Sequence, residues 1–145
     1  MVLPKKISKI KIKTKFSKKK RHWGDEILLN LISKTLSLKI LKIKKNKKGG
    51  LQFHRKKNEC GIIIKGILRI NFSDDGKKLK TKILKKGDVF HFPPGSIHQE
   101  HALTNCEIIE ASTPHFNDRV RVEKVFNFNE NKGLKTTKVK NIIFK

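Results

Sequence analysis

Several residue types are scarce in this sequence, and each scarcity excludes a class of protein. The 145 residues contain only two cysteines, Cys60 and Cys106, in neither a Cys-x-x-Cys pair nor a zinc-knuckle spacing. We therefore expect two free, buried thiols and no disulfide framework. The first ten residues lack the apolar core of a secretory signal, and no apolar run approaches the roughly 18 residues that span a bilayer. These absences predict a soluble, cytoplasmic protein without a membrane partner.

Acidic residues are also scarce, and their shortage sets the charge. Twelve Asp and Glu face 36 Lys and Arg, which gives a formal net charge of +24. Such a charge attracts polyanions, but only five of the basic residues are Arg, and the Lys residues are scattered along the chain. Nucleic-acid readers usually rely on the bidentate Arg fork and on interleaved aromatics. We expect the charge to be mostly compositional, with no specific nucleic-acid partner.

Common catalytic signatures are missing too. There is no tyrosine, no Ser-His-Asp order, no P-loop and no dinucleotide fingerprint. The length fits one domain with a real core. Short apolar or alternating runs are separated by turn signals every 8 to 12 residues, which is typical of a small antiparallel barrel. The strands expected from these runs lie over 27–32, 36–43, 51–56, 60–64, 67–72, 79–84, 89–92 and 107–111.

The stretch 87–98 carries the most specific pattern in the chain. Gly87 and Asp88 predict a turn, a short aromatic and β-branched strand follows, and Pro93-Pro94-Gly95 breaks that strand before His98. The spacing, with Gly87, Pro93, Gly95 and His98 at fixed intervals, resembles the second conserved motif of the cupin superfamily. The first motif has its counterpart upstream, where His54 and Glu59 are followed after six residues by Gly66.

Two further segments resemble the small cupins of the mannose-6-phosphate isomerase-like group. One is Trp23-Gly24-Asp25-Glu26, and the other is the Ser112-Thr113-Pro114 stretch that runs toward 118–123. The resemblance implies an all-β fold, an antiparallel double-stranded β-helix of the jelly-roll type, over residues 22–123. A basic arm at 1–21 and a tail at 124–145 would flank it. Trp23 would plug one end of the barrel, and the chain would form a homodimer.

The same resemblance implies a metal site. Imidazole and carboxylate donors suit zinc, manganese, iron or nickel, with zinc expected first, and His54, Glu59 and His98 supply such a set. On a regular strand Gln52 and Lys56 would share the face of His54. Cupins usually carry a second His where this chain has Lys56, and an ammonium repels a cation. Three outcomes stay open: Gln52 completes the shell, three protein ligands remain beside water, or Lys56 pairs with Glu59 in a metal-free pocket.

Two function classes follow from the resemblance. The first is a metal-dependent enzyme that interconverts an aldose and a ketose, acting on a sugar or sugar phosphate, with Glu59 or His101 as the base and Lys56 as a phosphate-binding or proton-transferring group. The second is a non-catalytic sugar-binding or scaffold cupin whose metal set has decayed at Lys56. An iron dioxygenase is the weaker alternative because it normally needs the missing His. The absent tyrosine argues against cupin epimerases that use a Tyr acid. Glu100 would join the site face only if its strand is regular.

Overall fold

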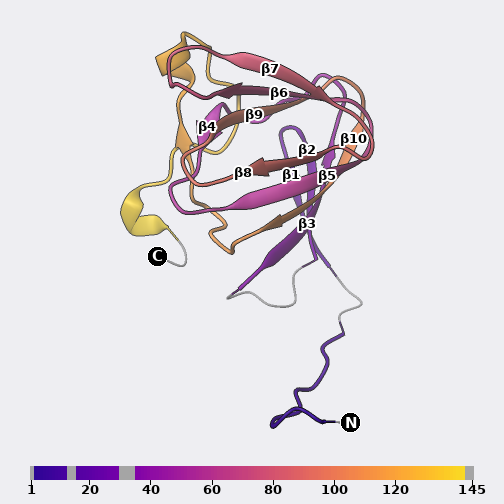
Figure 1. Cartoon of the computed structure of the whole chain (residues 1–145). Coiled ribbons are helices and arrows are strands. Elements are labelled where there is room, and N and C mark those ends of the chain that lie inside the picture. Colours follow the sequence, from indigo (N-terminus) through magenta and orange to yellow (C-terminus); the bar gives the residue numbers. More distant parts are fainter. Residues whose placement is uncertain (1, 13–15, 30–34, 143–145) are drawn as a thin grey trace.

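The chain folds into two antiparallel sheets that lie face to face (Figure 1). The computed structural model describes residues 2–12, 16–29 and 35–142. The first sheet has six strands in the order β1-β2-β3-β10-β5-β8. Their bounds are Ser17–Arg21 (β1), Gly24–Leu28 (β2), Ser37–Ile43 (β3), Cys106–Ser112 (β10), Glu59–Lys65 (β5) and Val89–Phe92 (β8).

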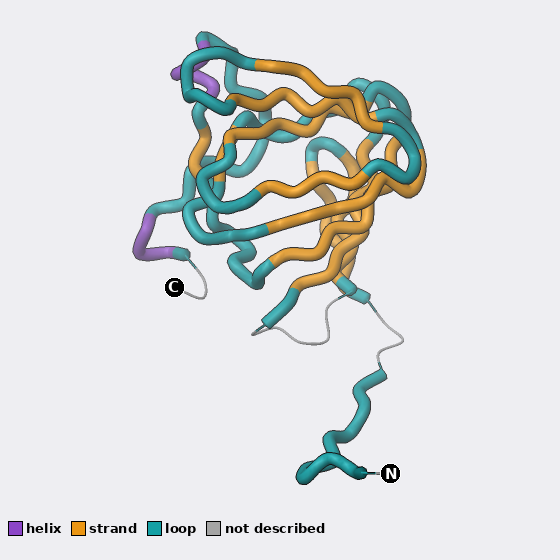
Figure 2. Tube along the Cα trace, viewed as in Figure 1, coloured by secondary structure: helices purple, strands orange, loops and turns teal. Residues whose placement is uncertain are grey.

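The second sheet has five strands in the order β11-β4-β9-β6-β7. Their bounds are Val120–Arg121 (β11), Gln52–Phe53 (β4), Ile97–Ala102 (β9), Leu68–Ser73 (β6) and Lys80–Leu84 (β7). Two short 3-10 helices, η1 (Glu123–Phe126) and η2 (Val139–Asn141), are the only helices in the described part of the chain (Figure 2). The architecture confirms the predicted all-β, jelly-roll type of double-stranded β-helix.

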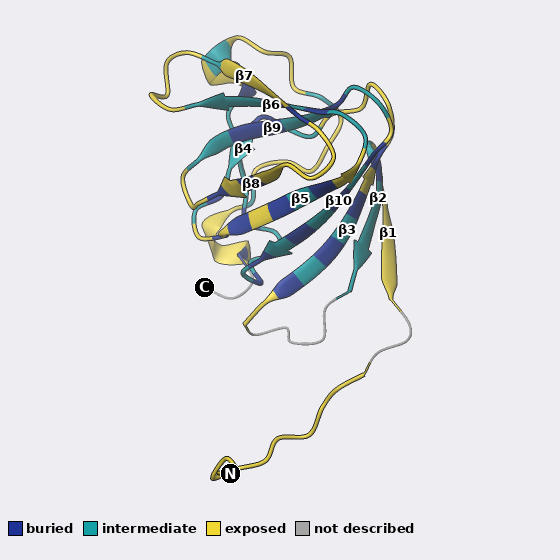
Figure 3. Ribbon diagram, turned by 45° about the vertical axis from the view of Figure 1, so that its right-hand side comes forward, coloured by how far each residue is buried: buried dark blue, intermediate teal, exposed yellow. Residues whose placement is uncertain are grey.

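The barrel interior divides into an apolar part and a charged part. Side chains alternate between the two faces of each strand, so the buried positions of β3 and β5 recur every second residue (Figure 3). The apolar core includes the fully buried Leu68, Ile63 and Ile108, and each such side chain contributes about 2 kcal/mol of burial free energy. Lys39, Glu59 and Glu110 are also buried, on inward positions of β3, β5 and β10. The charged part of the interior is therefore a candidate functional site.

Glycines permit close packing at two points that matter for the site. A Cβ on Gly61 would lie 2.4 Å from Cζ of Phe90, so the ring needs the bare backbone there. Gly95 has φ +83° in the turn before β9, a conformation that favours glycine. Its N–H donates to the carbonyl of His54 at 2.8 Å. This bond ties the two segments that carry the predicted ligands His54 and His98.

The strand predictions differ from the structure in a few places. The hairpin formed by β6 and β7 and the strand over 89–92 lie where the sequence places them. The strand expected over 51–56 ends already at Phe53. Of the strand expected over 27–32, residues 30–32 lie outside the described residues. Both cysteines are free, but Cys60 is exposed, not buried, because it alternates with the inward Glu59 and Gly61 on β5.

The chain ends differ in their relation to the barrel. Residues 2–12 are exposed and run away from the sheets, whereas 17–21, the end of the expected arm, form β1 and pair with β2 (Figure 1). The segment after β11 returns to the barrel, where the side-chain amide of Asn131 donates to the carbonyls of Lys48 and Gly49. Among the described residues no helix is long and apolar enough to span a membrane.

Candidate metal centre

Three side chains from separate strands and turns converge inside the barrel. Glu59 begins β5, His98 is the second residue of β9, and His54 follows β4. Oε1 of Glu59 lies 3.2 Å from Nε2 of His54 and 3.3 Å from Nε2 of His98. The three side chains are only 5 to 8% exposed, and their potential ligand atoms all lie within 4.8 Å of one another. The structure therefore brings together three of the four metal ligands expected from the sequence.

Hydrogen bonds fix which imidazole nitrogen faces the centre. Nδ1 of His54 donates to the carbonyl of Asp118, and Nδ1 of His98 donates to the carbonyl of Ser96 at 3.0 Å. A carbonyl can only accept, so Nδ1 carries the proton in both rings. In a neutral imidazole the other nitrogen, Nε2, is then an acceptor. When both rings are neutral, two nitrogen lone pairs and a carboxylate oxygen point at one small volume, an arrangement that a cation stabilises. When a ring is protonated instead, its Nε2–H donates to Oε1 of Glu59.

The distances also fit a first-row metal ion. Nitrogen and oxygen ligands lie about 2.0–2.2 Å from zinc, so neighbouring ligand atoms in a tetrahedral or octahedral shell are roughly 2.8–3.6 Å apart. The two Nε2–Oε1 distances, 3.2 and 3.3 Å, fall within that range. The donor set of two imidazoles and one carboxylate suits zinc, iron, manganese or nickel. The donor types and these two distances fit a divalent metal ion.

A buried lysine occupies the other side of Glu59. The ammonium of Lys57 donates to Oε2 of Glu59 and, at 3.2 Å, to Oε1 of Glu110. Burial works to lower the pKa of Lys57, but Glu110 and then Glu59 raise it above its usual value. Burial works to raise the pKa of Glu59, but Lys57 and the two imidazoles hold it well below its usual range. Glu59 is therefore an anion, with Oε2 bound to Lys57 and Oε1 facing the histidines.

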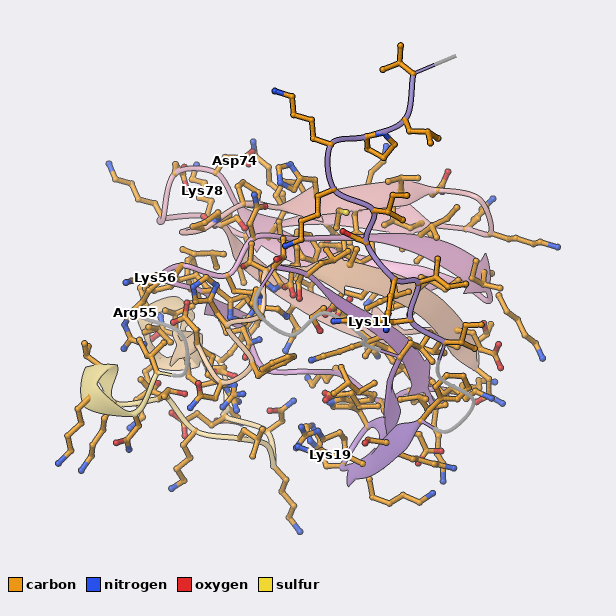
Figure 4. The ribbon with its side chains drawn as sticks, turned by 90° about the horizontal axis from the view of Figure 1, so that it is seen from below. Lys11, Lys19, Arg55, Lys56, Asp74 and Lys78 are labelled. Atoms are coloured by element: carbon orange, nitrogen blue, oxygen red, sulfur yellow. The ribbon has the colours of Figure 1, made fainter. Side chains whose placement is uncertain are left out.

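One buried aspartate explains why Lys57, and not Lys56, faces this site. Oδ2 of Asp118 accepts the backbone N–H of Lys56 at 2.6 Å and that of Lys57 at 3.1 Å. Its Oδ1 lies 3.6 Å from Nη1 of Arg55. Asp118 thus holds residues 54–57 in a turn, which ends the strand alternation expected for Lys56. The side chain of Lys56 is exposed at the periphery of the molecule (Figure 4).

The triad lies in a cavity of about 140 Å³ that holds several further polar side chains. Gln52 pairs directly with His98 across β4 and β9, and directly opposed residues point to the same face, so Gln52 lines the cavity beside the triad. Glu100, two residues after His98, lines it as well. Its Oε1 is buried and has no hydrogen-bond partner within the described chain. Burial, followed by repulsion from Glu110 and Glu59, raises the pKa of Glu100 to about 8.

His101 does not share this cavity. It alternates with Glu100 along β9 and lies opposite Arg69 of β6, so it points to the other face of the sheet. Burial and the neighbouring Arg69 and Lys48 lower the pKa of His101. The sequence reasoning missed Lys57, Lys39, Glu26 and Glu110, all of which line the cavity. For Glu110 the available signal was a charged residue that shares a strand face with Cys106 and Ile108, whereas the pattern around Lys39 gave no such signal.

The family of the chain follows from comparison with known proteins. The cupin family profile matches residues 29–139, which is most of the chain. The chain belongs to the cupin family. Cupins commonly bind a divalent metal. In this cupin, His54, Glu59 and His98 form a His-Glu-His cluster of the kind that can hold such an ion.

Two curated plant proteins are similar to parts of the cupin. One is germin-like protein subfamily 3 member 4 of Arabidopsis thaliana, 33% identical over 66 residues, or 44% of this chain and 31% of the relative. The other is a germin-like protein of Mesembryanthemum crystallinum, 40% identical over 57 residues, or 36% of this chain and 24% of the relative. The matched part spans less than a third of either relative.

Solved structures share the fold at low identity. The capsular polysaccharide assembling protein CapF of Staphylococcus aureus has a TM-score of 0.63 and 15% identity, over 76% of this chain and 35% of CapF. The Lactobacillus farciminis oxalate decarboxylase in a formate complex has a TM-score of 0.62 and 16% identity, over 75% and 34%. KdgF of Halomonas sp. has a TM-score of 0.53 and 17% identity, over 62% and 77%. At these identities the likeness supports the fold alone.

Proposed function

We propose that this cupin is a metal-dependent enzyme that acts on a sugar or sugar phosphate and interconverts an aldose and a ketose. The observation that carries the proposal is the combination, in one cavity, of the His-Glu-His cluster and the unpartnered carboxyl of Glu100. His54, Glu59 and His98 would hold the metal ion, which we expect to be zinc, and Gln52, which lines the same cavity, would add a fourth ligand. When bound, such an ion polarises a carbonyl or hydroxyl oxygen.

The chain's own residues divide the remaining work. Aldose–ketose isomerisation moves a proton between two adjacent carbons, which needs a group that can take and return it. Glu59 is not available for this task, because Lys57 and the histidines occupy both of its oxygens. Lys56 and His101, the other groups that the sequence suggested, lie outside the cavity lining. Among the described residues, Glu100 is the cavity carboxyl whose Oε1 has no hydrogen-bond partner, so we place the proton transfer on it.

Proton exchange with solvent tests the proposal directly. Zinc-loaded protein is incubated in D2O with an aldose phosphate, and deuterium entry at the carbon next to the carbonyl is followed by NMR. We expect exchange by the wild type and a loss of about a hundredfold in Glu100→Gln. Glu107→Gln is the matched control, because Glu107 lies on β10 with a 39% exposed side chain and pairs with Lys42. If the metal-loaded wild type shows neither deuterium exchange nor isomerised sugar, the proposal that the protein is an aldose–ketose isomerase is wrong.

A second candidate is a non-catalytic sugar-binding or scaffold cupin. The contact that favours it is the ammonium of Lys57 on Glu59, which supplies a cation beside the triad from the protein itself. In that case the protein binds sugar without metal and catalyses no exchange. The cytoplasmic location and the homodimer stay predictions from the sequence.

A further inference from the structure

Of the Lys and Arg side chains that line the cavity, all but one pair with a carboxylate in the described part of the chain. Each cation can be traced to its partners. Arg21 and Lys39 lie 3.4 and 3.5 Å from Oε1 of Glu26. Lys57 pairs with Glu59 and Glu110. These three basic side chains therefore share three carboxylates.

Arg121 is likewise saturated. Its Nε donates to Oε1 of Glu123 at 2.7 Å, its Nη2 to Oδ1 of Asn131 at 2.7 Å, and its Nη1 to the carbonyl of Leu134 at 3.2 Å. The side chain is 7% exposed. Arg121 thus stabilises the segment after β11, and its guanidinium donors are already used by acceptors within the protein.

Arg119 is the exception. It lines the cavity, yet it forms no ion pair within 4.0 Å among the described residues, and the one hydrogen bond its guanidinium donates there is a long one, 3.5 Å, to Oγ1 of Thr137. Burial and then the positive charge of Arg21 lower the pKa of Arg119, and the more distant carboxylates of Glu26 and Asp118 oppose that shift only in part. A guanidinium has five donors and stays charged in proteins, so most of the donors of Arg119 await an acceptor.

The position of Arg119 relates this free cation to the metal centre. It directly follows Asp118, whose carbonyl accepts Nδ1 of His54. The neighbouring Arg21 has a 23% exposed side chain, while the triad is 5 to 8% exposed. The arginine side of the cavity is therefore nearer to solvent than the His-Glu-His floor.

We propose that Arg119, assisted by Arg21, binds the oxyanion of a negatively charged substrate, a phosphate or a carboxylate, whose other end reaches the His-Glu-His cluster. The guanidinium fork matches the oxygens of such groups bidentately. This inference rests on the proposed function for the substrate's reacting end, and it narrows that substrate from sugars in general to charged ones. A neutral sugar would leave the half-buried guanidinium of Arg119 without an anionic acceptor.

Anion binding to metal-free protein tests the inference without any activity. Inorganic phosphate and, separately, acetate are titrated by calorimetry into wild type, Arg119→Gln and Lys86→Gln at an ionic strength of about 0.15 M, where exposed charges are largely screened. Lys86 lies in an exposed loop, so its substitution removes the same charge away from the cavity. We expect one oxyanion per chain, with affinity at least about tenfold weaker in Arg119→Gln and unchanged in Lys86→Gln. Which of the two anions binds more tightly identifies the substrate's charged group.

Two further measurements separate the possible failures. Melting temperature and zinc uptake are recorded for each variant, and Arg119→Lys, which keeps the charge and loses the fork, should bind the anion with intermediate affinity. Equal anion affinity in wild type, Arg119→Gln and Lys86→Gln would show counterion binding only and overturn the inference. Anion binding that depends on Arg119 in a protein that takes up no zinc would uphold the inference and refute the metalloenzyme.

Discussion

Lys57 offers the sharpest test of how the metal centre and the fold depend on each other. Its ammonium is buried between Glu59 and Glu110. Replacing it by glutamine leaves both carboxylates inside the barrel without their cation. Breaking a buried pair in this way costs about 3–5 kcal/mol. We therefore expect Lys57→Gln to lower the free energy of unfolding of the metal-free protein by about 3 kcal/mol.

The same substitution should strengthen metal binding. An ammonium about 5 Å from the ion, at an effective dielectric near 20, repels it by roughly 3 kcal/mol per unit charge product. Removing that repulsion also frees Oε2 of Glu59 as a ligand atom. Since desolvation and relaxation offset part of the gain, we expect zinc affinity to rise by at least about tenfold. Zinc should then raise the melting temperature of the variant more than that of the wild type.

The assay is zinc titration followed by urea unfolding, with Lys56→Gln as the matched control. Lys56 is the adjacent lysine, and its side chain is exposed, so its loss should change neither stability nor zinc affinity measurably. An unchanged stability in Lys57→Gln, or an effect of Lys56→Gln on zinc affinity, would refute the placement of these two residues.

Three further substitutions or conditions follow from the same structure. Asp118→Asn should lower the free energy of unfolding by about 1–3 kcal/mol, measured by urea unfolding at pH 7, whereas substitution of the exposed Asp74 by Asn should leave it unchanged. Burial works to raise the pKa of Asp118, but the backbone N–H groups that bond to its carboxylate lower that pKa below its usual value. The stability that Asp118 contributes is therefore present above about pH 4 and is lost as the pH falls through the lowered pKa. Equal losses in both variants would contradict this. Gly61→Ala should destabilise by about 1–3 kcal/mol by forcing Phe90 aside, while Gly49→Ala, with open space around its Cβ, should not; a neutral Gly61→Ala would show that the ring can move. DNA binding, measured by fluorescence anisotropy, should weaken steeply with salt, and sequence-selective binding at physiological salt would disprove a merely compositional charge.

The sequence predicted the fold and the core of the site because both depend on local spacing. The turn at Gly95 and the inward parity of Glu59 on β5 are fixed by residues next to them. The position of Lys56 depended on a strand that continues past Phe53, and Asp118, which ends that strand, lies 62 residues further along the chain. Tertiary contacts of this length leave no periodic signal.

Burial of charge was equally hidden in the sequence. On β3 the alternation of Leu38 and Ile40 with Ser37 and Lys39 indicates a strand, but Ser37 and Lys39 occupy the buried face. Lys39 is tolerated there because Glu26, on the neighbouring strand, lies 3.5 Å away. Hydrophobic patterning alone selects the opposite face, and only the pairing of strands reveals the compensation.

The central claim is that His54, Glu59 and His98 bind one divalent metal ion, and metal content measures it most directly. Protein purified without a histidine tag is stripped, dialysed against zinc, manganese or iron, and assayed by mass spectrometry alongside His98→Ala and His91→Ala. His91 is an exposed histidine bonded to Asn58 outside the cavity, so its variant controls for loss of any imidazole. We expect one ion per chain in the wild type and in His91→Ala, and at least about a tenfold lower affinity in His98→Ala. Equal uptake by all three proteins, or none by the wild type, would contradict the account.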